Sequence, residues 1–256
     1  MAPYWLQPGE SCGEEAKRAA AFAGYLRGRG LLRRDQTVLE IGSGKGHMAV
    51  EFAETAGHVT GLELSPLMCE AAKSRAAARG LDNTDFIVGD YCSFVPEEAG
   101  LPGQYDLVSA SMVPAAETYE GFRKLASLSR GSCFLAIQTE NRIPLFQELA
   151  SQVIGEREWE RRDKTIRLML AFDLLCLDGL RPEVFFYEMH FQNRIPGNEL
   201  ALQYFRRIWP RDTITEEETE TILRLLRDRA DRDGMLSPEM DMVIGCLFWD
   251  VKHGHR

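Results

Sequence analysis

The chain has 256 residues, of which 45% are hydrophobic and 27% charged, the proportions of a globular protein with a core of useful size. Its 39 acidic and 30 basic residues give a net charge of −9, which argues against broad contact with the phosphates of a nucleic acid. No apolar run has the length of a membrane span, and the first residues lack the charged and apolar regions of a secretory signal. We therefore expect a cytoplasmic protein without membrane contact.

The first 140 residues alternate between extended and helical patterns. Apolar residues at helical spacing predict helices over 14–29, 65–79 and 118–129, and a shorter one that ends near Thr55. Short apolar runs predict five strands: Thr37–Ile41, His58–Glu63, Asp85–Gly89, Tyr105–Ala110 and Cys133–Thr139. This alternation favours parallel strands in a doubly wound α/β sheet, in which ligands bind beyond the carboxyl ends of the strands.

The remaining residues are less regular. Helical patterns cover 144–155 and 159–178, and strand patterns cover Glu183–Gln192 and Asp241–Lys252. At least two helices lie between those strands, the second opened by a capping box of Thr215 and Glu218. We expect a single domain (1–256) with an N-terminal arm and helix (1–34), a ligand-binding core (35–140) and a C-terminal part (141–256) that carries a helical cap at about 196–238.

Six cysteines stand singly along the chain: Cys12, Cys69, Cys92, Cys133, Cys176 and Cys246. They form no C-x-x-C pair, and no cluster of cysteine and histidine has the spacing of a zinc site. We expect reduced thiols and no metal site.

Three glycines follow the first predicted strand, in the run Val38-Leu39-Glu40-Ile41-Gly42-Ser43-Gly44-Lys45-Gly46. Glycine is required where the backbone has a positive φ or where a ligand approaches the main chain without an intervening Cβ. The dinucleotide fingerprint G-x-G-x-x-G would place its third glycine at His47, whereas here it stands one residue earlier, at Gly46. The turn therefore predicts a bound ligand and disfavours a nicotinamide dinucleotide.

Acidic and small residues stand at the ends of the next strands. Glu63 follows Gly42 by twenty-one residues and is placed to accept hydrogen bonds from two ribose hydroxyls, a role that an NAD enzyme would also require. Asp90 could accept from an adenine amino group, although by itself it is better explained as a turn aspartate. Ser109 and Ser111 end the fourth strand. Their small side chains either leave room for a second ligand or simply pack in the sheet.

Four segments together resemble the class I S-adenosylmethionine-dependent methyltransferases over about residues 35–140: Val38–Gly46, Val59–Met68, Phe86–Tyr91 and Tyr105–Met112. The resemblance implies a Rossmann-like, seven-stranded sheet with its last strand antiparallel and helices on both faces. It also implies S-adenosyl-L-methionine as the cofactor.

The resemblance further implies roles for the matching residues. Glu40 and the segment Gly42, Ser43, Gly44 and Gly46 would bind the amino acid end of the cofactor. The other implied contacts are Glu63 to the ribose, Leu64 and Met68 to the adenine ring, Asp90 to the adenine amino group with Tyr91 beside it, and Ser109 at the methyl-transfer site.

The candidates for a general base are Tyr119, Glu140, His190 and His47. None has a fixed partner in the sequence, and His190 within a strand pattern is more often structural, so we assign no catalytic base.

We expect a methyltransferase whose acceptor is an unidentified small molecule. Strand four ends in Ser-Ala-Ser-Met-Val-Pro and not in the Asn/Asp-Pro-Pro-aromatic run typical of amino-group methylation, and no Pro-Cys marks a cytosine C5 enzyme. Two alternatives stay open: an enzyme acting on tRNA or protein, and a regulatory protein that binds the cofactor without transfer. A homo-oligomer also stays open.

Overall fold

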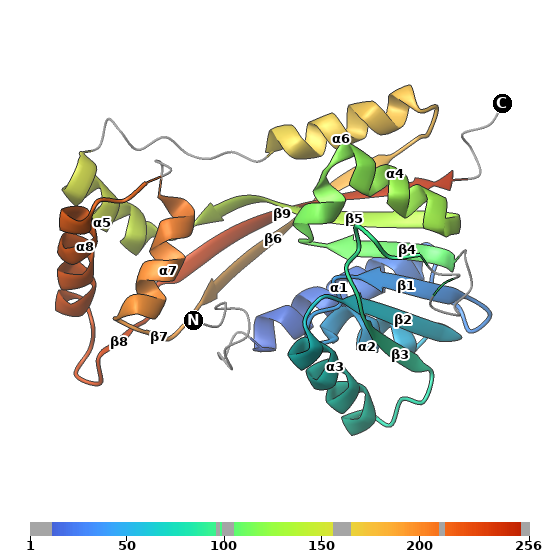
Figure 1. Ribbon diagram of the computed structural model, residues 1–256, viewed down its shortest axis with the longest axis horizontal. Helices are drawn as coiled ribbons and strands as arrows, with labels where there is room; N and C mark the ends of the chain where they lie inside the picture. The colour runs from blue at the N-terminus through green and yellow to red at the C-terminus, as the bar shows by residue number, and fades with distance from the viewer. Residues whose placement is uncertain (1–11, 96–97, 99–104, 156–164, 210–212, 252–256) are drawn as a thin grey trace. The chain divides into compact units, whose positions relative to one another are not determined.

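The computed structural model describes residues 12–95, 98, 105–155, 165–209 and 213–251. Seven strands form one sheet in the order β3-β2-β1-β4-β5-β9-β6, with β9 antiparallel to its neighbours (Figure 1). The strands are β1 (Thr37–Ile41), β2 (His58–Glu63), β3 (Thr84–Val88), β4 (Tyr105–Ser111), β5 (Ser129–Arg142), β6 (Glu183–Gln192) and β9 (Glu239–Asp250). This order confirms the predicted fold class, including the antiparallel last strand.

The helices follow the strands as predicted. They are α1 (Cys12–Gly28), α2 (His47–Ala53), α3 (Pro66–Ala78), α4 (Tyr119–Leu128), α5 (Pro144–Ile154), α6 (Thr165–Leu177), α7 (Glu199–Ile208) and α8 (Glu216–Asp228). Ser65 caps α3 through a bond from the Met68 amide, with proline in the first turn. Thr215 and Glu218 form the predicted capping box at the start of α8.

Side-chain parity places α1 on one face of the sheet and α4 and α6 on the other. Leu39 of β1 pairs with Val108 of β4 and shares a core cluster with residues of α4 and α6. The alternate residues point to the other face, where Phe134 of β5 meets Phe22 of α1 with ring centroids 5.3 Å apart. Glu40 and Ser109 are paired neighbours in the register and share the face of Phe134. The face that carries Glu40 is therefore the face that α1 covers.

Two features differ from the expected elements. Strand β5 begins at Ser129, immediately after α4, and continues to Arg142, so it is twice as long as the apolar run that predicted it. Between β6 and β9 lies a small ladder of β7 (Ile195–Pro196) and β8 (Met235–Leu236), too short to produce a periodic signal. The expected beginning of α6 at residue 159 lies outside the described residues.

The chain divides into two compact units. One contains Gly13–Ile137, Ile166–Phe186 and the residues from Gly245, and the other contains Gln138–Thr165 and Tyr187–Ile244. Each has its own hydrophobic core; in the second unit α5, α7 and α8 contribute Phe146, Phe205 and Ile222. The single domain with a helical cap at about 196–238 stays a prediction.

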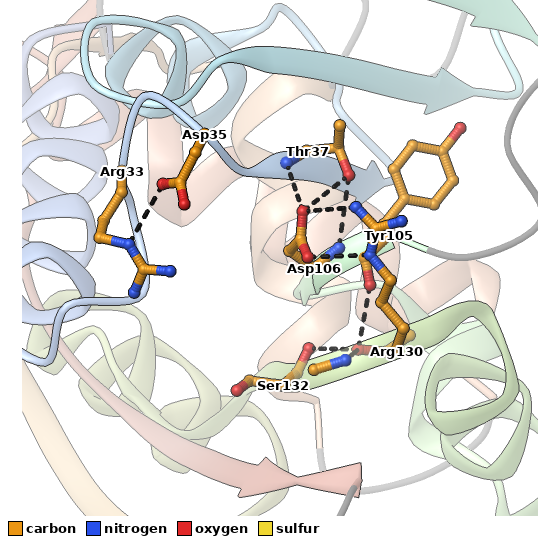
Figure 2. Close-up of polar contacts among 9 residues, drawn as sticks. Arg33, Asp35, Thr37, Tyr105, Asp106, Arg130 and Ser132 are labelled. Carbon is orange, nitrogen blue, oxygen red and sulfur yellow. Dashed lines mark hydrogen bonds and ion pairs between the residues drawn. The ribbon is translucent and has the colours of Figure 1, made fainter.

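Asp106 joins three strands at the amino edge of the sheet (Figure 2). Its carboxylate accepts from the backbone amide and hydroxyl of Thr37 on β1, at 2.9 and 3.1 Å, and makes a bidentate ion pair with Arg130 on β5, at 2.9 Å for both bonds. The hydrogen bond from Arg130, aided by those from Thr37, lowers the pKa of Asp106 to about 2. Ligands of doubly wound sheets bind at the carboxyl edge, so Asp106 serves the fold and not the site.

Among the described residues, no helix combines the length and the apolar character needed to cross a membrane. The cysteines whose side chains are described, at positions 69, 92, 133, 176 and 246, are free thiols. The cytoplasmic setting stays a prediction.

Candidate functional site

The glycine turn lies between β1 and α2 and is hydrogen-bonded to the end of β2. The amides of Gly42 and Ser43 both donate to the carbonyl of Leu62, at 2.8 and 3.1 Å, and the Gly46 amide donates to the Ser43 carbonyl at 2.8 Å. All three glycines have positive φ: 67° at Gly42, 53° at Gly44 and 77° at Gly46. The turn predicted from the sequence therefore places each of its three glycines in a conformation that favours glycine.

The three glycines differ in what surrounds them. A Cβ at Gly42 would collide with Val113, and a Cβ at Gly46 would lie 2.8 Å from the Cβ of Ala72 on α3. A Cβ at Gly44 would meet no atom of the described residues within 4 Å. Packing among these residues explains the glycines at 42 and 46, whereas the half-buried main chain at 44 leaves space that a ligand could occupy.

Glu63 binds the glycine turn to the end of β2. Its Oε2 accepts from the Gly44 amide and its Oε1 from the Ser65 amide, both at 2.9 Å. Because a carboxylate oxygen has two lone pairs, each of these oxygens keeps one acceptor site. The fixed carboxylate can therefore accept two further hydroxyl hydrogens close to Gly44.

The four residues expected to line an adenine ring stand after β2 and β3, at the carboxyl ends of these strands. Leu64 is 69% exposed directly after Glu63, whereas Met68 is buried in the first turns of α3. Asp90 follows β3, and its Oδ1 accepts from the Cys92 amide at 3.0 Å. Tyr91 is only 6% exposed and donates its hydroxyl hydrogen to the Gly121 carbonyl at 2.6 Å, so it packs under α4. Burial raises the pKa of the Tyr91 hydroxyl well above its ordinary value.

Glu40 is a buried acid at the carboxyl end of β1. It is 3% exposed, it accepts from the Ala49 amide, and its Oε2 has no hydrogen-bond partner among the described residues. Burial raises the pKa of Glu40 well above its ordinary value, and the neighbouring Glu63 adds to the shift. The hydroxyls of Ser43 and Ser109 are likewise buried without a partner in the described part of the chain. These three residues lie at the carboxyl ends of β1 and β4, where a polar ligand could supply the partners that the described residues do not.

Two residues near Glu40 were not found by sequence reasoning. Arg18 on α1 donates from Nη1 to the Met112 sulfur at 3.5 Å, and its charge favours the ionised form of Glu40. Met112, directly after β4, has a φ of 57°, a left-handed conformation that is strained for a residue with a Cβ. Neither residue type carries a motif, because a helical arginine and a methionine after a strand are common.

The four candidate bases are divided between the two compact units. His47 contacts Glu15 of α1, with Nε2 and Oε2 3.2 Å apart, and Tyr119 lies beneath the guanidinium of Arg123, 5.5 Å from the ring centroid. Glu140 and His190 belong to the other compact unit, where His190 pairs with Asp241 at 2.5 Å. The geometry assigns none of the four to proton transfer.

Comparison with known proteins matches residues 38–130 to a family described as a methyltransferase domain. A protein-L-isoaspartate O-methyltransferase from Polaromonas is 34% identical over 89 residues, 35% of this chain and 38% of the relative. A protein from Methanothermobacter thermautotrophicus named "Probable ribosomal RNA small subunit methyltransferase A" is 48% identical over 59 residues, 23% of this chain and 20% of the relative. The chain thus matches well under half the length of these two relatives.

A solved structure shares the fold. Magnesium protoporphyrin IX methyltransferase from Synechocystis, determined with bound S-adenosylhomocysteine, superposes with a TM-score of 0.50 at 16% identity and covers 90% of this chain and 82% of its own. The fold and the matched segment together place residues 38–130 in the family of class I S-adenosylmethionine-dependent methyltransferases.

Proposed function

We propose that the protein transfers a methyl group from S-adenosyl-L-methionine to a small-molecule acceptor. The observation that carries this proposal is the open main chain at Gly44, next to the fixed carboxylate of Glu63. A ribose diol needs two acceptors held side by side, and the two oxygens of Glu63 supply them.

The groups on either side of Glu63 fit the two ends of the cofactor. The exposed Leu64 side chain supplies an apolar surface for an adenine ring, and the second oxygen of Asp90 can accept from its amino group. At the other end, no described residue donates a hydrogen bond to Oε2 of the buried Glu40, and a ligand ammonium would supply both a donor and a compensating charge. We therefore assign Glu40 to the amino acid end.

The chemistry of transfer requires positioning more than acid–base catalysis. When bound, S-adenosyl-L-methionine supplies a methyl group already activated by a positively charged sulfur. Ser109 and Ser111 end β4 beside the strained backbone of Met112, so small side chains line the expected acceptor side. Orienting two reactants can lower a barrier by as much as ~7–11 kcal/mol. The residues of the site can thus act without a dedicated base when the acceptor atom is already deprotonated.

A macromolecular acceptor is the second candidate. The relatives include one named for isoaspartyl protein and one named for ribosomal RNA, so the matched segment serves several acceptor classes. The net charge of −9 favours a small acceptor over RNA, because RNA binding draws on a basic surface.

Native mass spectrometry tests the cofactor assignment first. The purified chain mixed with S-adenosylhomocysteine should give a one-to-one complex, and NAD under the same conditions should give none. A chain that binds NAD and not S-adenosylhomocysteine would contradict the proposal.

An acceptor screen then tests the reaction. Small-molecule extracts incubated with the protein and S-adenosyl-L-methionine should generate S-adenosylhomocysteine above the level without extract. Turnover confined to RNA or protein fractions would replace the small-molecule acceptor by a macromolecular one.

A further inference from the structure

The segment that follows β3 forms a single helical turn beginning at Asp90. The Asp90 carbonyl accepts from the amides of Ser93 and Phe94, at 3.1 and 2.8 Å, while its side chain accepts from the Cys92 amide. The orientation of the carboxylate is therefore tied to the shape of this turn, which we call the Asp90 turn (residues 90–94).

Lys124 of α4 binds the same turn through two of its carbonyls. Its ammonium donates to the carbonyls of Tyr91 and Cys92, at 2.5 and 2.9 Å, and lies 5.1 Å from the centroid of the Tyr91 ring. The hydrogen bonds of an ammonium to carbonyls are charge-assisted, and the nearby ring face adds a cation–π contact. Lys124 thus holds two consecutive peptide groups of the turn in one orientation.

A third bond runs between the same elements in the other direction. Tyr91 donates its hydroxyl hydrogen to the Gly121 carbonyl, one turn before Lys124 on α4. A Cβ at Gly121 would collide with the carbonyl of Ala115, so α4 itself is closely packed on the segment that follows β4. The Asp90 turn is therefore bonded to α4, and α4 in turn packs closely on the segment that follows β4.

We propose that Lys124 is a positioning residue for adenine recognition: it fixes the Asp90 turn so that the Asp90 carboxylate faces the exocyclic amino group of the cofactor. This inference rests on the proposed function, because it assumes that Asp90 binds adenine. Without the ammonium, two carbonyls lose their donor and the turn can rotate, and the carboxylate then loses its alignment. Lys124 itself touches no part of the cofactor in this account.

Calorimetry with two ligands separates this role from a general effect on stability. The ligands are S-adenosylhomocysteine and its analogue in which purine replaces adenine, so that only the exocyclic amino group differs. The ratio of their affinities measures recognition of that group, and it does not depend on the fraction of folded protein. The variants are Lys124→Met, which keeps an unbranched apolar side chain without the charge, and Lys73→Met, an exposed lysine of α3 that pairs with Glu70.

The wild-type protein should favour S-adenosylhomocysteine over the analogue by roughly tenfold or more, the strength of one hydrogen bond to a charged group. Lys124→Met should reduce this preference about fivefold, mainly by weakening S-adenosylhomocysteine, while Lys73→Met should preserve it. Asp90→Ala should abolish the preference, and Lys124→Met should then change it no further, because the two residues act on the same contact.

Two results would overturn parts of the account in distinguishable ways. A Lys124→Met variant that keeps the wild-type preference shows that Lys124 serves only the fold. A wild-type protein that binds neither ligand refutes the proposed function itself.

Discussion

Gly44 differs from the two glycines beside it because no atom of the described residues occupies the space that a side chain would take. Packing among these residues therefore does not explain the glycine, and we propose that a ligand does. We propose the same for Glu40, because its burial is compensated only in part by Arg18 and the Ala49 amide. These two residues carry the most direct single-site tests.

Gly44→Val should weaken binding of S-adenosylhomocysteine by at least about tenfold, because a branched side chain would fill the space beside Glu63. In addition, a positive φ costs a residue with a Cβ roughly 1–2 kcal/mol. The matched control is Gly80→Val, which has a similar φ of 66°, equally open surroundings and a place at the exposed end of α3. Thermal unfolding should show similar losses of stability in both variants. Equal losses of affinity in both would contradict a ligand contact at Gly44.

The affinity for S-adenosylhomocysteine should rise with pH above the ordinary titration range of a carboxyl group, because Glu40, with its raised pKa, must lose a proton before it can pair with the ligand ammonium. Binding should accordingly release protons, which calorimetry detects as a dependence on the ionisation enthalpy of the buffer. Glu40→Gln should bind more weakly, and its affinity should vary little with pH. If the affinity of the variant changed with pH as steeply as that of the wild type, a residue other than Glu40 would be the titrating group.

At the scale of elements, both edges of the parallel strands are fixed by carboxylates, with opposite consequences. At the amino edge Asp106 is fully engaged by Thr37 and Arg130, and its pKa is lowered. At the carboxyl edge Glu63 keeps acceptor sites and Glu40 keeps a raised pKa. The first arrangement stabilises the sheet, and the second suits a ligand.

Asp106→Asn should lower the free energy of unfolding at neutral pH by about 1–2 kcal/mol, because it removes a partly buried, bidentate ion pair. The folded pKa of about 2 lies below the ordinary value of 3.8, so this stabilisation is present above about pH 4 and is lost as the pH falls towards 2. Urea unfolding at several pH values should therefore show the curves of wild type and variant converging in acid.

The control for this prediction is Asp35→Asn, also visible in Figure 2, whose partner Arg33 is 3.2 Å away in an exposed pair. Exposed pairs contribute little, so this variant should unfold like the wild type. If the difference in free energy of unfolding between wild type and Asp106→Asn stayed constant down to pH 2, the ion pair would not be the cause of that difference.

For the whole molecule, every residue assigned to the cofactor lies in the unit that contains Gly13–Ile137, whereas α5, α7 and α8 form the core of the other unit. Phe205→Ala should therefore destabilise that second unit by about 3–5 kcal/mol while leaving the affinity for S-adenosylhomocysteine unchanged. A loss of cofactor affinity as large as that of Gly44→Val would show that the cofactor site extends beyond its assigned unit. If Phe205→Ala does not fold, Phe205→Leu provides a milder change.

Much of the cofactor-binding half could be predicted from local signals. Strands β1 and β2 have the predicted bounds because a glycine turn and the Ser65-Pro66 helix start follow them directly. The length of β5 could not be predicted, because Ser129 and Arg142 extend it through pairing with neighbouring strands rather than through their own apolar pattern.

The site divides in the same way. Glu40, Glu63 and the glycines stand at fixed spacings from a strand, so a motif locates them. Arg18 contacts a residue 94 positions further along the chain, and Lys124 contacts residues 32 and 33 positions before it. Met112 has a backbone conformation that its residue type does not suggest. Such contributions depend on tertiary contacts, and only the folded chain displays them.

Titration of S-adenosylhomocysteine into the wild-type protein and into Glu63→Ala, with Glu70→Ala as the control, tests the central claim most directly. Glu70 is an exposed acid of α3 that pairs with Lys73, so its loss should leave binding unchanged. Loss of Glu63 removes two hydrogen bonds to a charged group and should weaken binding about a hundredfold or more, with the fold intact by circular dichroism. Binding by Glu63→Ala that equals the wild type would contradict the assignment of this turn to the cofactor.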